Sequence, residues 1–463
     1  MPLGLYISVP FCRTKCSYCN FASDVFSKSS YENYVTRLLE DIANSRQLAS
    51  ELGCAFDTNA DSIYLGGGTP SILDASQLLR IFAALRAQFA VTPDAEITVE
   101  CAPGTLTPAL IETLLQCGVN RVSLGVQSFV DREAQSVGRL HKRSIVLEEI
   151  SRLRKAGLAN INIDLIAGLP RQTAESWAFS LSEAIAAGVP HASVYMLEVD
   201  QDSRLGRELI AGGARYHAHF VPDDDATADF YLQACETLDS AGLQQYEISN
   251  FARATAHLQG GQIQNNESRH NLKYWTRQPY IGLGVDAHSM LKLVEGRASS
   301  PVRVGTAAPG CPAERSSAAA CGLSNARFTT AADGIEADRP QAVRFATPDS
   351  LDAYMNRAPQ TVTPVSAQAA IEESFFLGLR LNRGIDIESL LKLLKGCHLD
   401  PELAGGEPPV VWESAIQQSV QDGLVERQDA TLRLTARGRL LSNEVFARFL
   451  AEEKVGTGHV NPR

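Results

Sequence analysis

The chain has 463 residues, of which 42 are Lys or Arg and 53 are Asp or Glu, so its net charge is −11. Hydrophobic residues make up 44% of a composition with 34 Gly, 21 Pro and 10 Cys, which is typical of a globular protein and excludes disordered, fibrous and disulfide-scaffold classes. The acidic charge gives no reason to expect a nucleic-acid partner, no apolar run reaches the length of a membrane span, and the first residues lack the cationic flank of a signal peptide, so we expect a cytoplasmic protein.

Short β-branched runs alternate with helix-period segments through the first half of the chain. The predicted strands are Leu3–Val9, Ser62–Leu65, Glu96–Glu100, Arg121–Val126, Asn160–Ile166, Ala192–Leu197 and Gln244–Ser249. The predicted helices are Tyr31–Leu52, Ser76–Phe89, Pro108–Gln116, Ser144–Ala156, Ala174–Ala187 and Ala226–Ala241. Nearly continuous apolar strands are buried on both faces, which indicates a parallel sheet covered by helices. The fold class is therefore α/β, as a complete or partial (β/α) barrel or a doubly wound sheet.

Polar residues gather at the ends of consecutive predicted strands. The second strand runs into Gly66-Gly67-Gly68-Thr69-Pro70, the third ends in Glu100, the fourth in Gln127, and the fifth carries Asp164. Each of these residues could merely end a strand or cap a helix. Because such folds bind ligands at the carboxyl ends of their strands, the set as a whole predicts a binding site there.

The alternating pattern breaks beyond Leu291. Residues 297–340 are rich in Ala, Ser, Gly and Pro and include Cys311 and Cys321, which predicts a flexible insertion, and residues 255–267 predict a shorter one. Order resumes with predicted helices at Ala367–Leu381, Ile387–Leu394 and Trp412–Gln421, a hairpin over 423–434 and a last helix ending at Leu450. We therefore predict three parts: a barrel over 1–291, the insertion over 292–345, and a smaller winged-helix-like α+β domain over 346–455.

Winged-helix modules often bind DNA, so the charge of this part matters. Residues 366–453 contain nine Lys and Arg residues against fourteen Asp and Glu residues. A DNA-binding module needs the opposite sign. We expect no nucleic-acid partner, and a wing that packs on the barrel or on another protein.

The strongest motif is Cys12-Arg13-Thr14-Lys15-Cys16-Ser17-Tyr18-Cys19, a C-x3-C-x2-C run directly after the first predicted strand. Three thiolates so close in sequence can hold one soft metal centre. A structural zinc site needs four protein ligands, and no matching Cys or His pair follows. The run therefore favours an iron–sulfur cluster with one open iron, and a zinc-binding interaction protein stays as an alternative.

The cysteine run followed by GGGTP at Gly66–Pro70 resembles the radical S-adenosylmethionine (SAM) superfamily. That resemblance implies a partial (β/α) barrel that carries a [4Fe–4S] cluster on Cys12, Cys16 and Cys19. It also implies that SAM binds the open iron through its methionine amine and carboxylate.

Further motifs resemble the group that contains oxygen-independent coproporphyrinogen III oxidase and the heme chaperone HemW. They are LYISVPFC at Leu5–Cys12, GVQSF at Gly125–Phe129, GRLH at Gly138–His141, NIDLIAGLP at Asn162–Pro170 and YEISNF at Tyr246–Phe251. By match to this pattern, the resemblance implies SAM contacts from Tyr6, Gly67, Gly68, Thr69, Glu100, Gln127, Arg139 and Asp164, with Tyr18 lining the cluster loop.

Two departures separate the chaperone from the oxidase. The oxidase has a further Cys two positions after its last cluster ligand and an extension ahead of the first strand, whereas Cys19 is followed by Asn20-Phe21 and this chain starts on the strand. In addition, His270, Asn271, Tyr274 and Trp275 match the H-N-x-x-Y-W motif that the chaperone family associates with heme. A neutral imidazole suits heme iron as an axial ligand, although a hydrogen-bonded core histidine is the alternative.

The resemblance thus implies a heme chaperone with three cofactors: a [4Fe–4S] cluster, SAM and heme. It also implies a reductant for the cluster and an apo-hemoprotein that receives heme as partners. The oxidase, which decarboxylates coproporphyrinogen III by radical chemistry in porphyrin biosynthesis, is the alternative function. The sequence assigns no catalytic residue and leaves open whether the chain is an enzyme and whether it forms oligomers.

Overall fold

The computed structural model describes residues 1–254, 256–257, 263–264, 266–294, 340–390 and 410–450. These residues form two compact units, of which the first ends at Val365 and the second begins at Ser366. The predicted division after residue 345 differs from this arrangement because residues 342–365 add two strands to the sheet of the first unit. The predicted insertion with Cys311 and Cys321, most of the shorter insertion, and the end of the predicted helix Ile387–Leu394 lie outside the described residues.

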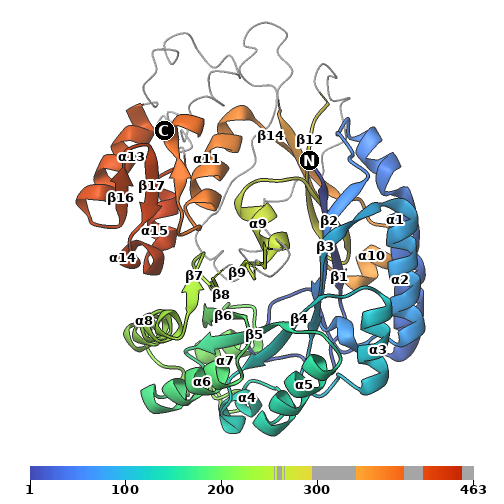
Figure 1. The fold of residues 1–463 in the computed structure, drawn as a ribbon, viewed down its shortest axis with the longest axis horizontal. Coiled ribbons are helices and arrows are strands. Elements are labelled where there is room, and N and C mark those ends of the chain that lie inside the picture. Colours follow the sequence, from blue (N-terminus) through green and yellow to red (C-terminus); the bar gives the residue numbers. More distant parts are fainter. Residues whose placement is uncertain (255, 258–262, 265, 295–339, 391–409, 451–463) are drawn as a thin grey trace, which may run out of the picture. The chain divides into compact units, whose positions relative to one another are not determined.

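One mixed sheet dominates the first unit (Figure 1). Its strand order is β14-β13-β12-β11-β1-β2-β3-β4-β5-β6-β8-β7. The strands are β1 (Leu3–Val9), β2 (Asn59–Gly67), β3 (Ala90–Cys101), β4 (Arg121–Gln127), β5 (Asn160–Ala167), β6 (His191–Met196), β7 (Leu243–Gln245), β8 (Asn250–Arg253), β11 (Tyr280–Gly284), β12 (His288–Lys292), β13 (Ala342–Ala346) and β14 (Thr361–Val365). A separate pair joins β9 (Ala256–His257) to β10 (Ile263–Gln264).

The central strands are parallel. Strands β1 to β6 pair in chain order, and β11 pairs in parallel with β1 on its other side. Antiparallel strands extend the sheet at both ends, so that β14 and β7 form its edges. The predicted fold class, a partial (β/α) barrel, is confirmed.

Helices follow most of the parallel strands, and α1, α2, α3 and α5 lie along the outside of the curved sheet in Figure 1. The helices of this unit are α1 (Lys28–Glu51), η1 (Pro70–Ile72), α2 (Ala75–Gln88), α3 (Pro108–Gln116), α4 (Asp131–Ser136), α5 (Arg143–Lys155), α6 (Ala174–Ala186), α7 (Arg204–Ala211), η2 (Ala218–Phe220), α8 (Asp224–Ser240), α9 (Arg269–Trp275) and α10 (Leu351–Met355). Over the described ranges, no helix combines the length and the apolarity that a membrane crossing requires.

Local sequence signals explain where these helices begin. Asp74 accepts a hydrogen bond from the Gln77 N–H, and the Gln77 side chain accepts one in return from the Asp74 N–H, which forms a capping box ahead of α2. Thr107 caps α3 with Pro108 at its first position, where the missing N–H costs nothing. These caps place each helix start directly after the loop that leaves a strand.

Side chains on the parallel strands alternate between an apolar outer set and a polar inner set. The outer set, which includes Ile63, Val99 and Leu124, is fully buried. The alternate positions carry Ser62, Tyr64, Glu96, Thr98, Glu100, Arg121, Ser123, Asn162, Asp164, His191 and Ser193, and we call their side of the sheet the inner face. Strand pairing brings these residues into register and lines the barrel interior with polar groups.

Two predicted elements of regular structure are wrong. The predicted strand Gln244–Ser249 is a hairpin, because the buried carboxylate of Glu247 accepts hydrogen bonds from the Ser249 N–H and the Asn250 side chain and so holds a turn between β7 and β8. The predicted last helix is two short helices, α14 (Ala436–Leu440) and α15 (Ser442–Ala447), because Leu441 between them leaves the helical conformation.

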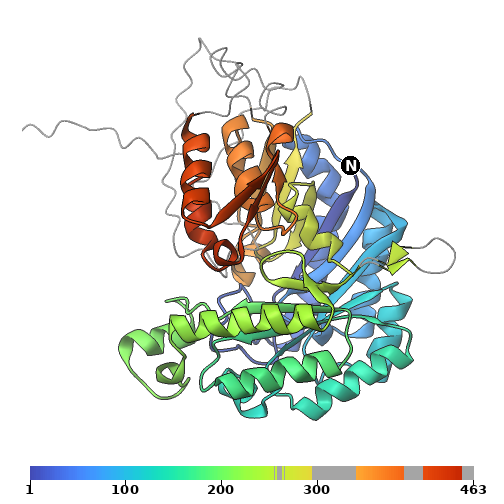
Figure 2. The ribbon, with the colours of Figure 1, turned by 60° about the vertical axis from the view of Figure 1, so that its left-hand side comes forward.

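The second unit is the predicted winged-helix-like domain. It contains α11 (Ala367–Gly378), β15 (Ile385–Asp386), α13 (Val410–Gln421), β16 (Val425–Gln428), β17 (Thr431–Leu434), α14 and α15. The strands form a small antiparallel sheet in the order β15-β17-β16, and Figure 2 shows β16 and β17 beside α13. Its core stacks the Phe375 ring on the Phe449 ring, with centroids 4.7 Å apart, and places the Trp412 ring 5.6 Å from that of Phe375.

We expect Phe375→Ala to destabilise this unit strongly. Phe375 is 2% exposed and contacts two other aromatic rings, so its removal leaves a cavity that costs about 3–5 kcal/mol of unfolding free energy. Chemical denaturation followed by tryptophan fluorescence measures this loss. Phe179→Ala is the control, because that side chain is 41% exposed in the first unit and its removal leaves no cavity.

Candidate functional site

The predicted cluster ligands lie in the loop after β1. Cys16 is buried, while Cys12 and Cys19 are partly exposed. Burial raises the pKa of both the Cys12 and the Cys19 thiols, so without a metal these groups stay protonated. A bound metal would stabilise the thiolates and release their protons, as metal binding to cysteine does in general.

Backbone hydrogen bonds hold the cluster loop against the neighbouring loops. The Gly68 N–H donates to the Val9 carbonyl and the Thr69 N–H donates to the Phe11 carbonyl, each at 2.7 Å. On the other side, the Ser17 N–H donates to the Val137 carbonyl at 3.1 Å. The loop that carries the three cysteines is thus fixed to the glycine loop after β2 and to the segment after α4.

The described residues contain no group of three His, Cys, Asp or Glu side chains placed around a single ion. An iron–sulfur cluster makes a different demand, because each thiolate binds its own iron and the sulfurs do not converge on one point. The three cysteines on one loop fit a cluster held by thiolates alone.

Glycine is required where the loop after β2 meets the cluster loop. A Cβ at Gly68 would lie 2.6 Å from the Phe11 carbonyl oxygen and 2.9 Å from that of Val9, which are backbone atoms. Gly67 has φ +98°, a conformation that other residues rarely adopt. Thr69 follows with its Oγ1 3.8 Å from the Cys12 sulfur. The three SAM residues predicted here therefore lie directly beside the first cluster ligand.

Two carboxylates follow on the inner face. Both Glu100, at the end of β3, and Asp164, on β5, keep part of their surface exposed. Burial, and then the charge of Asp164, raises the pKa of Glu100 to about 8. Burial also raises the pKa of Asp164, whose carboxylate accepts hydrogen bonds from Asn162 Nδ2 at 2.7 Å and Ser123 Oγ at 3.1 Å. Neither carboxylate has an ion pair within the described structure, so both are suited to a ligand with positive charge and hydrogen-bond donors.

Three further predicted SAM residues come together beside the cluster loop. An Arg139 guanidinium N–H donates to the Tyr18 hydroxyl at 3.0 Å, and Tyr18 packs against the buried core of Val137 and Leu169. Gln127 follows a bulge in β4 and has φ +70°. The Arg139 Nε and the Gln127 Oε1 are buried and have no hydrogen-bond partner in the structure. One unused donor and one unused acceptor at this place fit a polar ligand such as SAM.

Tyr6 lies farther along the inner face. Its ring centroid is 6.2 Å from those of Tyr64 and His270, and burial raises the pKa of its hydroxyl. It therefore lies beside His270 of the predicted heme motif and beside Tyr64, whose hydroxyl donates to Glu100.

The predicted heme motif forms α9, and most of its side chains are buried. His270 is 1% exposed, Tyr274 and Trp275 are buried, and Asn271 is half-buried. Burial, and then the charge of Lys273, lowers the pKa of His270 to about 3, so its ring is neutral at physiological pH. Both ring nitrogens already have partners, Ser62 Oγ at 3.0 Å and the Tyr274 hydroxyl at 2.8 Å. Both ring nitrogens are therefore engaged, as in the hydrogen-bonded core histidine that the sequence leaves as the alternative.

The sequence pattern missed several inner-face residues that support the predicted site. Tyr64 donates to Glu100, and Ser123 and Asn162 donate to Asp164. The alternation of side chains along a strand could have identified them. Asn162 lies two residues before Asp164 on β5, and strand pairing places Ser123 beside both Glu100 and Asn162, so these polar residues share one face of the sheet. Tyr64 belongs to the same face through its pairing with Thr98, two residues before Glu100.

Comparisons with known proteins agree with this architecture. The family model of the radical SAM superfamily matches residues 6–183, and that of the HemN C-terminal domain matches residues 365–441. The heme chaperone HemW of Escherichia coli is 35% identical over 64% of this chain and 72% of its own length. The heme chaperone HemW of Bacillus subtilis is 28% identical over 96% of this chain and 99% of its own.

A solved structure, that of the coproporphyrinogen III oxidase HemN from Escherichia coli, matches with a TM-score of 0.70 over 97% of this chain and 90% of its own, at 21% identity. At that identity the likeness concerns the fold. The superfamily match supports the predicted cluster and SAM as cofactors, and the predicted resemblance is confirmed. On the identity and coverage of its relatives, this chain belongs to the heme chaperone HemW family of the radical SAM superfamily.

Proposed function

We propose that this chain is a cytoplasmic heme chaperone that delivers heme to an apo-hemoprotein. Cys12, Cys16 and Cys19 hold a [4Fe–4S] cluster, the strand-end residues bind SAM, and a region that includes α9 binds heme. Similarity to HemW proteins over nearly the whole chain supports the heme part of this proposal. Cys12, Cys16, Cys19, Cys54, Cys101 and Cys117 are free thiols, which accords with a reducing compartment.

The observation that carries the cofactor part is the meeting of three loops at one end of the sheet. Hydrogen bonds join the cysteine loop to the glycine loop and, through Ser17 and Tyr18, to the segment after α4 that carries Val137 and Arg139. Glu100 and Asp164 follow on the inner face. SAM carries a sulfonium, an ammonium and ribose hydroxyls, which complement two carboxyl groups that form no ion pair within the described residues. The cluster, when bound, supplies the iron that holds SAM and the route for an electron.

The test is anaerobic reconstitution of the full chain, followed by three measurements on one sample. Iron and sulfide analysis and SAM binding test the cofactors, a heme titration followed by absorbance tests heme binding, and transfer to an apo-hemoprotein tests delivery. We expect an iron–sulfur protein that binds heme stoichiometrically and gives it up to the acceptor. A protein that holds zinc alone, or that binds no heme, contradicts the proposal.

The same sample also tests the alternative function, that of a coproporphyrinogen III oxidase. With a reductant, SAM and coproporphyrinogen III, we expect no decarboxylated product. Formation of protoporphyrinogen IX would show that the chain is an oxidase and would contradict the proposed chaperone function. The shared fold with the solved oxidase leaves this question to the assay, because fold alone does not determine function.

We expect SAM binding at pH 7 to release close to one proton from Glu100. In the free protein the pKa of Glu100 is about 8, so its carboxyl group is mostly protonated at pH 7. Positive charge and hydrogen-bond donors on SAM favour the carboxylate and lower this pKa, so a proton leaves as SAM binds. The release fades as the pH rises above the pKa of about 8, where Glu100 is already ionised. Calorimetry in buffers of different ionisation enthalpy measures it.

Glu100→Gln should abolish this proton release. Glu149→Gln is the matched control, because burial also raises the pKa of Glu149 while its carboxylate bonds the Gly104 and Leu106 N–H groups away from the SAM residues. We expect Glu149→Gln to release protons as the unaltered chain does. Equal release from the Glu100→Gln variant would show that another group titrates.

A further inference from the structure

Helix α9 is seated on the inner face by close packing at β1. A Cβ at Gly4 would lie 2.6 Å from the Lys273 Cδ and 3.2 Å from the His270 Cε1, so a larger residue at this position would require these two buried side chains to shift. Ser268 caps the helix, and the His270 N–H donates to Glu96 Oε1 at 3.3 Å. Strands β1 and β3 thus both contact α9, and Asp61 and Ser62 add contacts from β2.

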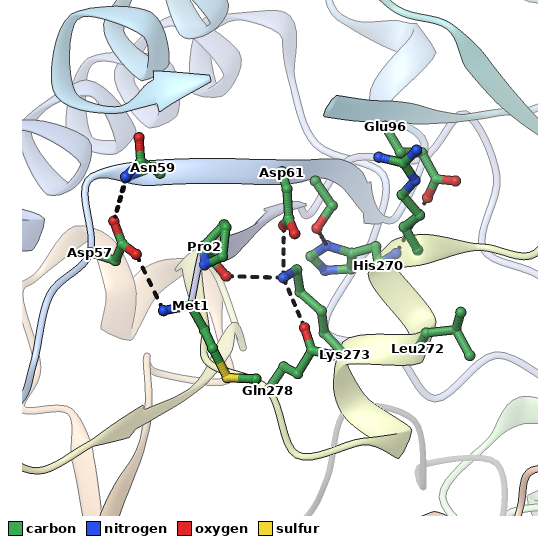
Figure 3. A network of polar contacts seen from close by, with 12 residues as sticks. Met1, Pro2, Asp57, Asn59, Asp61, Glu96, His270, Leu272, Lys273 and Gln278 are labelled. Carbon is green, nitrogen blue, oxygen red and sulfur yellow. Dashed lines mark hydrogen bonds and ion pairs between the residues drawn. The ribbon is translucent and has the colours of Figure 1, made fainter. Parts of the chain in front are cut away.

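Lys273 anchors α9 through an ion pair and hydrogen bonds of its ammonium group (Figure 3). It is 2% exposed, and its ammonium lies 2.7 Å from Asp61 Oδ1, 3.0 Å from the Pro2 carbonyl oxygen and 3.4 Å from Gln278 Oε1. A buried ammonium needs such partners, because an unpaired charge costs several kcal/mol. Lys273 therefore fixes α9 on the same face from which His270 meets Ser62 and Tyr64.

The His270 ring is enclosed by its partners. Nδ1 bonds Ser62 Oγ at 3.0 Å and Nε2 bonds the Tyr274 hydroxyl at 2.8 Å, which engages both ring nitrogens. The ring also stacks on Tyr64, with centroids 5.4 Å apart and planes inclined by 29°. Iron ligation would require one of the two hydrogen bonds to break and the ring to leave this stack.

The Tyr64 ring, which stacks on His270, also carries the hydroxyl that bonds Glu100, one of the predicted SAM residues. The Tyr64 hydroxyl donates to Glu100 Oε1 at 2.8 Å, and Tyr64 keeps part of its surface exposed while His270 has almost none. A continuous set of contacts therefore runs from α9 through His270 and Tyr64 to Glu100. A shift of the His270 ring would move Tyr64 and, with it, the hydrogen bond to Glu100.

We propose that His270 is a positioning residue and is not the axial ligand of heme. It fixes α9 through Ser62 and Tyr274, and through Tyr64 it fixes Glu100, a protein residue that binds SAM in the proposed function. This inference rests on the proposed function, because it concerns the route by which the heme motif acts. It reassigns the motif from ligation to the support of both sites.

Removal of the partners of His270 separates the two roles. Ser62→Ala and Tyr274→Phe each free one ring nitrogen, so a ligating His270 would bind heme as well as before or better. A positioning His270 loses its anchor, and we expect both variants, like His270→Gln, to bind heme about tenfold more weakly. The absorption and EPR spectra of the heme that still binds should stay those of the unaltered chain in all three variants.

Tyr231→Phe is the matched control. Tyr231 is 2% exposed and its hydroxyl donates to the Ile248 carbonyl at 2.7 Å, so the change removes a buried tyrosine hydrogen bond whose acceptor lies outside α9. Its heme affinity should be unchanged. A new axial-ligand spectrum in His270→Gln alone, with normal affinity in Ser62→Ala and Tyr274→Phe, overturns the proposal, and so does unchanged affinity in all three.

SAM binding provides a readout that needs no heme. Tyr64→Phe keeps the ring on His270 but removes the bond to Glu100, so we expect weaker SAM binding with unchanged heme affinity. His270→Gln should also weaken SAM binding, because it releases the Tyr64 ring. Failure of the unaltered chain to bind heme would defeat the proposed function, whereas normal SAM affinity in both variants would defeat this inference.

Discussion

Replacement of Cys12, Cys16 and Cys19 together by Ala is expected to abolish the cluster, so that the reconstituted variant keeps neither iron nor sulfide. The unaltered chain should hold about four irons, three of them each bound to one of these thiolates. The described residues contain no group of three or more His, Cys, Asp or Glu side chains placed around a single ion, so no alternative site there would keep the metal in the variant. Loss of the broad visible charge-transfer absorption after anaerobic reconstitution gives the simplest measurement, and metal and sulfide analysis gives the stoichiometry.

A second variant controls for the loss of cysteine itself. Cys54 and Cys117 are buried core thiols, 5% and 1% exposed, and neither lies on the cluster loop. Cys54→Ala with Cys117→Ala should lower stability by about 1 kcal/mol for each thiol removed and leave the iron and sulfide content unchanged. Retention of both elements by the triple variant would refute the ligand assignment. Loss of the cluster should also remove SAM binding, since the open iron would be gone.

The central strands were predictable because their residues satisfy two demands at once. Apolar side chains such as Ile63 and Val99 are buried under the outer helices, and their β-branched shape also favours the extended chain. This pattern can be recognised in each strand by itself, without knowledge of the strand with which it pairs. Strand β1 begins and ends where predicted, at Leu3 and Val9. Strands β2 and β3 extend beyond their predicted limits because pairing with neighbours recruits polar residues that have little strand propensity of their own.

The hairpin at β7 and β8 could not be read from the local sequence. Its turn depends on Glu247, a charged residue that is fully buried and bonded within the turn, and a sequence pattern treats such a residue as exposed. Strands β13 and β14 were missed for a different reason. They follow a long stretch without periodicity and join the sheet through β12, so only the tertiary structure shows that they belong to the first unit.

The residues of the candidate site likewise fall into two groups, those that the sequence identified and those that only the structure shows. Residues that belong to contiguous motifs, such as the three cysteines and the glycine loop, were identified by their spacing. Tyr64 and Ser62 were not, since their significance lies in contacts with Glu100 and His270, which are 36 and 208 residues away in the chain. His270 itself shows the limit of a motif, which names the residue that matters without giving the partners that determine what it does.

Gly68→Ala is expected to disrupt both the cluster loop and the SAM site. The added Cβ would lie 2.6 Å from the Phe11 carbonyl oxygen and 2.9 Å from that of Val9, and because these are backbone atoms neither can turn away. Relief requires the two loops to separate, which breaks the hydrogen bonds from Gly68 to Val9 and from Thr69 to Phe11. At about 1 kcal/mol each, their loss disfavours the assembled site by roughly 30-fold. Iron content after reconstitution and SAM affinity should both fall.

The matched control for this change is Gly157→Ala. Gly157 has φ +92° and no atom within 4 Å of an added Cβ, so the substitution costs about 1–2 kcal/mol of backbone strain without any clash. It lies after α5, away from the cluster loop, and should lower the unfolding temperature while iron and SAM binding stay normal. If Gly68→Ala instead assembles a normal cluster and binds SAM normally, the two loops must tolerate separation. The close approach of Gly68 to Val9 and Phe11 would then have no part in forming the site.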